Sequence, residues 1–91
     1  MKKINICDTR LRRLSAICRI LNSGETLNLE EIRRRSSDLM DSDFSPSTLD
    51  KDLAYLKLNF DVELTHCGSY GLRLAEPFDF VERLRSYLNL F

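Results

Sequence analysis

The fold is decided by the stretch FSPSTLDKDLAYLK, which occupies residues 44–57. Ser45 can cap the N-terminus of a helix, and Pro46 suits the first helical position, where a missing backbone N–H costs nothing. Leucines then recur at three- and four-residue spacing, so one face of this helix carries Leu49, Leu53 and Leu56. We therefore expect an amphipathic helix over about residues 46–58, ending before Asn59.

Two helices are predicted upstream of this stretch. The first begins near Asp8 or Thr9, ends at Gly24 in a left-handed cap, and has an apolar stripe of Leu11, Leu14, Ile17, Cys18 and Leu21. The second is capped by Asn28, has Glu31 at the capping-box position, and runs to about Met40. Its inward residues are expected to be Ile32, Ser36 and Leu39 or Met40. Between these helices, Thr26 and Leu27 could pair briefly as a very short strand.

Downstream, the apolar period changes from that of a helix to that of a strand. Val62, Leu64 and His66 alternate with their neighbours, and the alternation resumes after Gly68-Ser69 with Tyr70, Leu72 and Leu74. This pattern predicts a β-hairpin over residues 62–75. Residues 77–91 read as a last helix with one apolar stripe of Val81, Leu84, Leu88 and Phe91. That stripe either closes the core of the domain or pairs with a twin in a homodimer.

The predicted class is mainly α with a small β-hairpin (α+β): a three-helix core, a two- or three-stranded wing and a C-terminal helix. Such an order of helices followed by a hairpin is that of a winged helix-turn-helix domain. We assign residues 1–76 to this domain and residues 77–91 to dimerisation or linkage. The segments Ser45–Leu56 and Gly68–Leu74 resemble the N-terminal domain of bacterial transcription regulators that carry a WYL sensor domain, which overlaps the DeoR-type domains.

The resemblance covers about residues 9–80 and implies sequence-specific binding of double-stranded DNA in the cytoplasm, by a homodimer. It also implies that the natural protein continues past Phe91 into a sensor domain. Where members of that family carry arginines in the recognition helix, this chain has Pro46, Ser47 and Asp50, and only Lys51 keeps a positive charge.

The candidate DNA contacts are polar and basic residues of three predicted elements. A recognition helix presents its N-terminal residues to base edges in the major groove. From the third helix we expect contacts by Ser45, Ser47, Thr48, Asp50, Lys51 and Tyr55, with Asp52 as a local ion-pair or hydrogen-bond partner instead of a base reader. The second helix offers Arg33, Arg34 and Arg35, and the wing offers Tyr70 and Arg73. A second basic set comprises Lys2, Lys3, Arg10, Arg12 and Arg13. Binding should depend mainly on the arginines of the first two helices and of the wing.

Each of these assignments has an alternative that involves no contact with DNA. The arginine run could be a solvated helix face paired with Glu30, Glu31 and Asp38. Tyr55 and Tyr70 could cap the core with their hydroxyls at the surface. The whole domain could instead bind a protein, because Lys+Arg and Asp+Glu are both 14 and the net charge is zero. In that case the acidic residues of the third helix and the turn before it would mark a partner-binding face.

The composition of the chain limits which other functions it could have. The chain of 91 residues is expected to make one domain and has no apolar run long enough to span a membrane. Its start has two lysines but no apolar core behind them, so it is not expected to be a signal peptide. Its three cysteines form no CxxC pair and are expected to be reduced, and with a single histidine no metal site or cofactor is expected. His66 and Cys67 would point to opposite faces of a strand, so a nucleophile–base pair is not expected and the chain is not predicted to be an enzyme.

Overall fold

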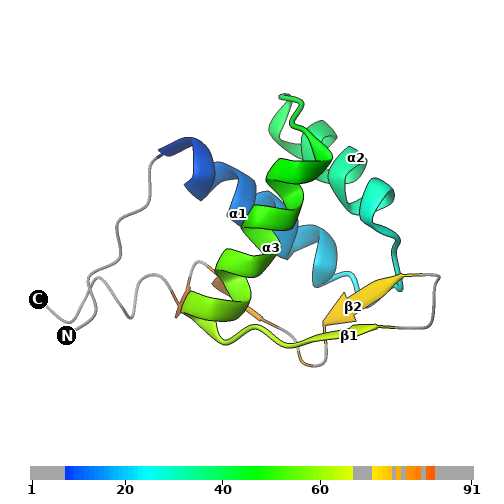
Figure 1. The fold of residues 1–91 in the computed structure, drawn as a ribbon, viewed down its shortest axis with the longest axis vertical. Helices are drawn as coiled ribbons and strands as arrows, with labels where there is room; N and C mark the ends of the chain where they lie inside the picture. Colours follow the sequence, from blue (N-terminus) through cyan, green and yellow to red (C-terminus); the bar gives the residue numbers. More distant parts are fainter. Residues whose placement is uncertain (1–7, 67–70, 75, 77, 81, 84–91) are drawn as a thin grey trace, which may run out of the picture.

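The computed structural model describes residues 8–66, 71–74, 76, 78–80 and 82–83, and its elements follow the predicted order (Figure 1). Three helices come first: α1 (Asp8–Leu21), α2 (Leu29–Met40) and α3 (Pro46–Phe60). An antiparallel hairpin of β1 (Leu64–His66) and β2 (Leu72–Leu74) follows. The predicted α+β class is confirmed, and the arrangement is winged-helix-like. No helix in the described part of the chain is both long and apolar enough to cross a membrane.

Some predictions fall on residues that the structure does not describe. Most of the expected last helix lies outside the described residues, as does the tip of the wing. Neither the tyrosine of the wing nor the dimer stripe is therefore placed, and the residues concerned are Tyr70, Val81, Leu84, Leu88 and Phe91.

The N-terminal ends of α2 and α3 are capped as the sequence predicts. The Ser45 hydroxyl accepts the backbone N–H of Thr48, and Pro46 takes the first helical position. The Asn28 side chain accepts the N–H of Glu31 at 2.8 Å and donates to the Glu31 carboxylate at 3.1 Å. A side-chain cap of this kind stabilises a helix by about 1 kcal/mol. These caps fix where α2 and α3 begin.

The C-terminal end of α2 agrees with the prediction, since the helix runs to Met40, whereas the end of α3 does not. The third helix does not stop before Asn59 but continues through Phe60. Its last residue is kept helical because the Phe60 side chain is fully buried in the core. Asp61 then takes the left-handed conformation that closes it. In α2, Ser36 is buried as expected, but Leu39 is 43% exposed, because the last turn of α2 lines an open groove beside α1 instead of the core.

The core lies where the three helices meet the hairpin. Phe60 is at its centre, with the rings of Phe80 at 5.1 Å and Phe78 at 6.3 Å between centroids. Around these aromatic rings are buried aliphatic residues from every described element except β1, including Leu14, Ile17, Leu21, Ile32, Leu49, Leu53, Leu56 and Leu72. The stripe predicted for the third helix is therefore the one that the core uses.

The wing is tied to the helices by a third extended segment. Leu27, which was expected to form a very short strand, makes an isolated bridge with Leu72: the Leu72 N–H donates to the Leu27 carbonyl at 2.7 Å, and the Leu27 N–H donates back at 3.0 Å. Gly71 permits this close approach, because a Cβ there would lie 2.6 Å from the Leu27 oxygen. The segment before α2 thus fixes the position of β2.

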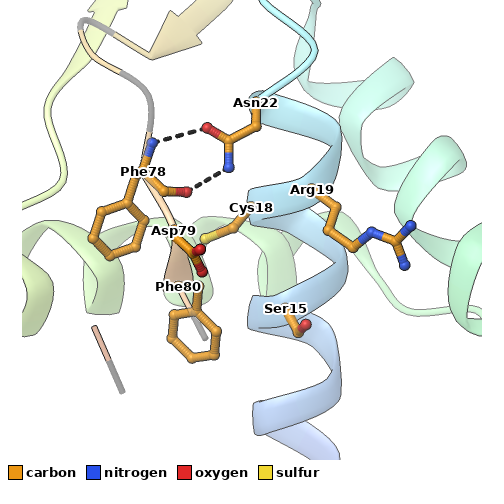
Figure 2. Close-up of a pocket in the computed structure, with 7 residues that line it drawn as sticks. All are labelled: Ser15, Cys18, Arg19, Asn22, Phe78, Asp79 and Phe80. Atoms are coloured by element: carbon orange, nitrogen blue, oxygen red, sulfur yellow. Dashed lines mark hydrogen bonds between the residues drawn. The ribbon is translucent and has the colours of Figure 1, made fainter. Parts of the chain in front are cut away.

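The end of α1 holds the segment that follows the wing. Figure 2 shows the Asn22 amide facing the backbone of Phe78: it donates to the Phe78 carbonyl and accepts the Phe78 N–H at 2.9 Å. The Asp79 carboxylate then accepts the N–H of Glu82 at 2.9 Å, and the Arg83 N–H donates to the Asp79 carbonyl at 3.0 Å. This hydrogen bonding is typical of a helix start. Gly24, just after α1, has the predicted left-handed conformation, with φ of 82°.

Candidate nucleic-acid interface

The helix α3 divides into a buried and an exposed side along its whole length. Its buried side carries Leu49, Asp52, Leu53, Leu56 and Phe60. The opposite side, which we call the exposed α3 face, consists of Ser47, Asp50, Lys51, Ala54, Lys57 and Leu58. Its residues recur at helical spacing, and no other described element covers them. It provides a continuous surface about three turns long on which a groove of DNA could lie.

Three hydroxyl groups gather at the start of α3. The Ser45 oxygen lies 3.1 Å from that of Ser47 and 2.9 Å from that of Thr48, while it also caps the helix. Ser45 is therefore engaged in the cap, whereas Ser47 is exposed and Thr48 is half-buried. Hydroxyls at a helix N-terminus suit contacts with a phosphate or with base edges. Of the three, Ser47 is the residue with the greatest access to a ligand.

Asp52 forms ion pairs as predicted, but its partners are not local as was expected. Its side chain has no exposed surface, and it binds two arginines of α1 instead of its neighbours Lys51 and Tyr55. The Arg13 Nε is 2.6 Å from one carboxylate oxygen, and the Arg10 Nε is 3.3 Å from the other. A buried carboxylate needs such pairing because desolvation otherwise disfavours its charge. The pairing also removes two arginines from the second basic set.

Tyr55 lies at the edge of this ion-pair cluster. The guanidinium of Arg10 is 4.8 Å from the centre of the Tyr55 ring, and the ring of Phe60 is 6.2 Å away on the same helix. Tyr55 is half-buried and packs against the core. This position matches the alternative in which the tyrosine covers the core, and it leaves the ring little freedom to stack on a base.

The first arginine of α2 is engaged in the connection between α2 and α3. Arg33 forms ion pairs with Glu30 and, at 2.6 Å, with Asp43, and it donates to the Phe44 carbonyl at 3.0 Å. Only 18% of its side chain is exposed. These contacts hold the turn in front of Ser45 against α2. Arg33 therefore positions the start of α3 and has no free donor set for a phosphate.

The electrostatics of that turn follow from the same contacts. The hydrogen bond from Arg33 lowers the pKa of Glu30 below its ordinary value, and the same bond raises the pKa of Arg33 further. The pKa of Asp43 is lowered chiefly by the backbone N–H of Phe44, then by the Ser37 hydroxyl and by Arg33. All three groups are thus held in their charged forms near neutral pH.

The other two arginines of the run differ from each other. Arg35 pairs with Glu25 at 2.8 Å and with Glu31 at 3.5 Å, and 38% of its side chain is exposed. Arg34 is exposed and forms no ion pair with any described residue. The alternative of a helix face paired with acidic residues is thus realised by Arg33 with Glu30 and by Arg35 with Glu31. The predicted pairing with Asp38 is not formed among the described residues. Only Arg34 is fully available to a phosphate.

On the wing, Arg73 faces solvent. It lies opposite Thr65 in the hairpin register, between the half-buried Leu74 and the buried Leu72. Among the described residues it has no ion-pair partner. The described elements therefore leave four exposed, unpaired cations on α2, α3 and the wing, namely Arg34, Lys51, Lys57 and Arg73.

Sequence reasoning missed part of the exposed α3 face. Ala54, Lys57 and Leu58 were not assigned, although Leu58 is 75% exposed and Lys57 adds a positive charge. The signal was present, since these positions continue the spacing of Ser47, Asp50 and Lys51 around the helix.

Comparison with protein-family models, with curated proteins and with solved structures finds no match to this chain.

Proposed function

We propose that this chain is a cytoplasmic, sequence-specific DNA-binding domain of a transcription regulator. The observation that carries the proposal is the exposed α3 face: a helix at the recognition position of a winged-helix arrangement, capped at its start and uncovered on one side. α3 would enter the major groove with Ser47, Asp50 and Lys51 at the base edges. The wing, with Arg73, would contact the flanking backbone.

The expected base contacts follow from the side-chain chemistry of this face. Lys51 would donate to guanine, and Asp50 would accept from the amino group of cytosine. Ala54 would offer an apolar contact to a thymine methyl group. A face that places an aspartate and an alanine beside its two lysines favours discrimination between bases over nonspecific attraction to phosphate.

The salt dependence of binding gives a quantitative expectation. Arg34, Lys51, Lys57 and Arg73 are exposed and unpaired within the described elements, so one protomer would neutralise up to about four phosphates. The slope of log affinity against log salt should then be about −3 to −4 for each protomer. A homodimer on two half-sites would double it. The ion pairs of Arg10, Arg13, Arg33 and Arg35 are the reason that the slope is not larger.

The test begins with selection of a preferred duplex from a random library, followed by fluorescence anisotropy across a salt series. Ser47→Glu adds a negative charge on the exposed α3 face and should weaken binding by at least about tenfold. Ser23→Glu makes the same change in the exposed turn after α1 and should leave affinity nearly unchanged. Equal losses in the two variants, or no wild-type binding at low salt, would reject this interface. Light scattering of the complex gives the number of protomers.

A second candidate function is protein binding through the same face. The observation that favours it is Leu58, which is 75% exposed on a face that also carries the unpaired Asp50. Leu58→Ser distinguishes the two functions, because it removes an apolar contact without changing charge. DNA affinity unchanged by Leu58→Ser and lost in Lys51→Glu would support the DNA-binding function.

A further inference from the structure

A second surface lies on α1, away from α3. Arg13 faces α3, where it binds Asp52, whereas Arg12, Ser15 and Arg19 are turned away from Arg13 by roughly 100–160° around the helix. Between α1, the last turn of α2 and Phe80 the surface is hollowed into an open groove of about 580 Å³, which we call the α1 groove. It adjoins the hollow shown in Figure 2 and shares with it Ser15, Arg19 and Phe80.

The walls and floor of the α1 groove are mainly apolar. Phe80 is 3% exposed and forms part of one wall, and Leu39, at 43% exposed, belongs to the other. The remaining apolar lining comes from Leu11, Ala16 and Met40. Leu39 is one of the few large aliphatic residues that the described fold leaves exposed, and here it contributes to a concave surface instead of a lone surface position.

The charge of the α1 groove has one dominant sign. Arg12 and Arg19 lie seven residues apart on α1, so both line the groove on nearly the same side of the helix, with their Cα atoms about 10 Å apart. Both are exposed, and neither forms an ion pair in the described part of the chain. The carboxylate of Asp79, which accepts the N–H of Glu82, lines the neighbouring hollow and not the α1 groove. The groove thus combines an apolar floor with two unsatisfied positive charges.

We propose that the α1 groove binds an acidic amphipathic helix of a partner protein. Apolar side chains at helical spacing would fill the hollow between Phe80 and Leu39. Two carboxylates seven residues apart on the partner would meet Arg12 and Arg19, because that spacing repeats the separation of the two arginines on α1. The charge of the groove selects this occupant over a basic helix, and its place behind α3 leaves the exposed α3 face free. The proposal therefore stands independently of DNA binding.

The test uses the full chain and two blocked helical peptides. Both have leucines at positions i, i+3, i+4 and i+7 of a helix; one has two glutamates seven residues apart, and the other has lysines in those places. Titrations are followed by peptide fluorescence anisotropy and by amide shifts of the labelled protein. The glutamate peptide should bind at least about tenfold more tightly than the lysine peptide, with shifts on α1 and the last turn of α2.

Charge reversal provides the decisive variant. Arg12→Glu/Arg19→Glu should exchange the preference, so that the lysine peptide becomes the tighter ligand. Leu39→Glu should weaken binding, whereas Leu58→Glu, an equally drastic change at an exposed leucine of α3, should not. Equal binding of both peptides, or shifts centred on α3, would overturn the proposal. Self-association of the chain through the groove, abolished by Leu39→Glu, would also overturn it, because a second copy would then be the occupant.

Discussion

The Nε atom of Arg13 in α1 lies 2.6 Å from a carboxylate oxygen of Asp52 in α3, and the Asp52 side chain is fully buried. A second contact joins Arg13 Nη2 to the other oxygen at 3.4 Å, and Arg10 approaches that oxygen from the preceding turn. The carboxylate is thus held from one side by α1 while the neighbouring leucines hold α3 in the core. This geometry fixes the rotation of α3 about its own axis, and with it the residues that α3 exposes.

Removing the buried carboxylate should destabilise the fold. Asp52→Ala leaves two arginines facing a buried gap, and breaking a buried pair costs roughly 3–5 kcal/mol. We expect the lower part of that range, because the side chains of Arg10 and Arg13 keep 32% and 15% exposure and can be hydrated. Urea unfolding measures the change. Asp50→Ala, on the exposed α3 face, is the control and should stay within about 0.5 kcal/mol of wild type. Similar losses in both variants would contradict the assigned role of Asp52.

Filling the space at Gly71 should open the connection between the wing and the segment before α2. The Cβ of Gly71→Ala would lie 2.6 Å from the Leu27 carbonyl oxygen, which is backbone and cannot rotate away. We expect a loss of about 1–3 kcal/mol in thermal unfolding. The amide protons of Leu27 and Leu72, which form the bridge, should exchange faster with solvent. Gly24→Ala is a useful comparison, because it meets no atom and should cost only the strain of φ at 82°. Unchanged exchange at Leu27 would refute the predicted opening.

The Asn22 side chain should act as a clasp for the segment that carries Phe78 and Phe80. Asn22→Asp keeps an acceptor for the Phe78 N–H but loses the donor to the Phe78 carbonyl. Asn22→Ala loses both hydrogen bonds. At about 1 kcal/mol for each hydrogen bond, the alanine variant should lose about 2 kcal/mol. The aspartate variant keeps one hydrogen bond but sets a carboxylate oxygen against the Phe78 carbonyl oxygen, so it should be destabilised as well. Chemical denaturation orders them, and a loss in neither variant would show that the aromatic contacts alone hold the segment.

Acid should loosen the turn between α2 and α3. The pKa values of Glu30 and Asp43 are lowered from their ordinary 4.5 and 3.8, for Glu30 mainly by Arg33 and for Asp43 mainly by the Phe44 N–H. A lowered pKa gives stability that is present above the ordinary value and is lost as pH falls through the folded-state value. Stability should therefore decline below about pH 4.5, and Arg33→Gln should reduce this decline. Melting curves from pH 7 downward test this prediction, with Arg34→Gln as the matched control. Identical pH profiles for the two variants would contradict the role of Arg33 in the acid sensitivity of the turn.

Local sequence signals were sufficient to predict the elements and most helix ends. Ser45 with Pro46, and Asn28 with Glu31, define helix starts by contacts within three residues, and the structure forms those contacts. The end of α3 was misplaced because Phe60 is retained in the helix by distant rings of Phe78 and Phe80, which no local pattern reveals. The prediction left the inward residue at the end of α2 open between Leu39 and Met40, and the structure exposes Leu39 and half-buries Met40. Helical spacing gives the face of α2 but not the point at which the neighbouring helix ceases to cover it.

Charged residues were harder to predict than apolar ones. Asp52 falls on the same stripe as Leu49, Leu53 and Leu56, which was a signal for burial, but its partners are about forty residues away in α1. Likewise the run Arg33-Arg34-Arg35 looks uniform in sequence, yet it separates into a residue that holds a turn, an exposed cation and a residue paired with two glutamates. Such differences depend on tertiary geometry, which brings acids from other elements to each guanidinium.

The bridge between Leu27 and Leu72 also bears on how the molecule folds. It joins a residue ahead of α2 to the last strand, so it closes a loop that contains α2, α3 and β1. Closing so long a loop costs chain entropy before any contact offsets it, whereas the helices need only local contacts. We expect the helices to be formed in the folding transition state and the bridge to form after it. Mutations at the bridge should then speed unfolding and leave the folding rate almost unchanged.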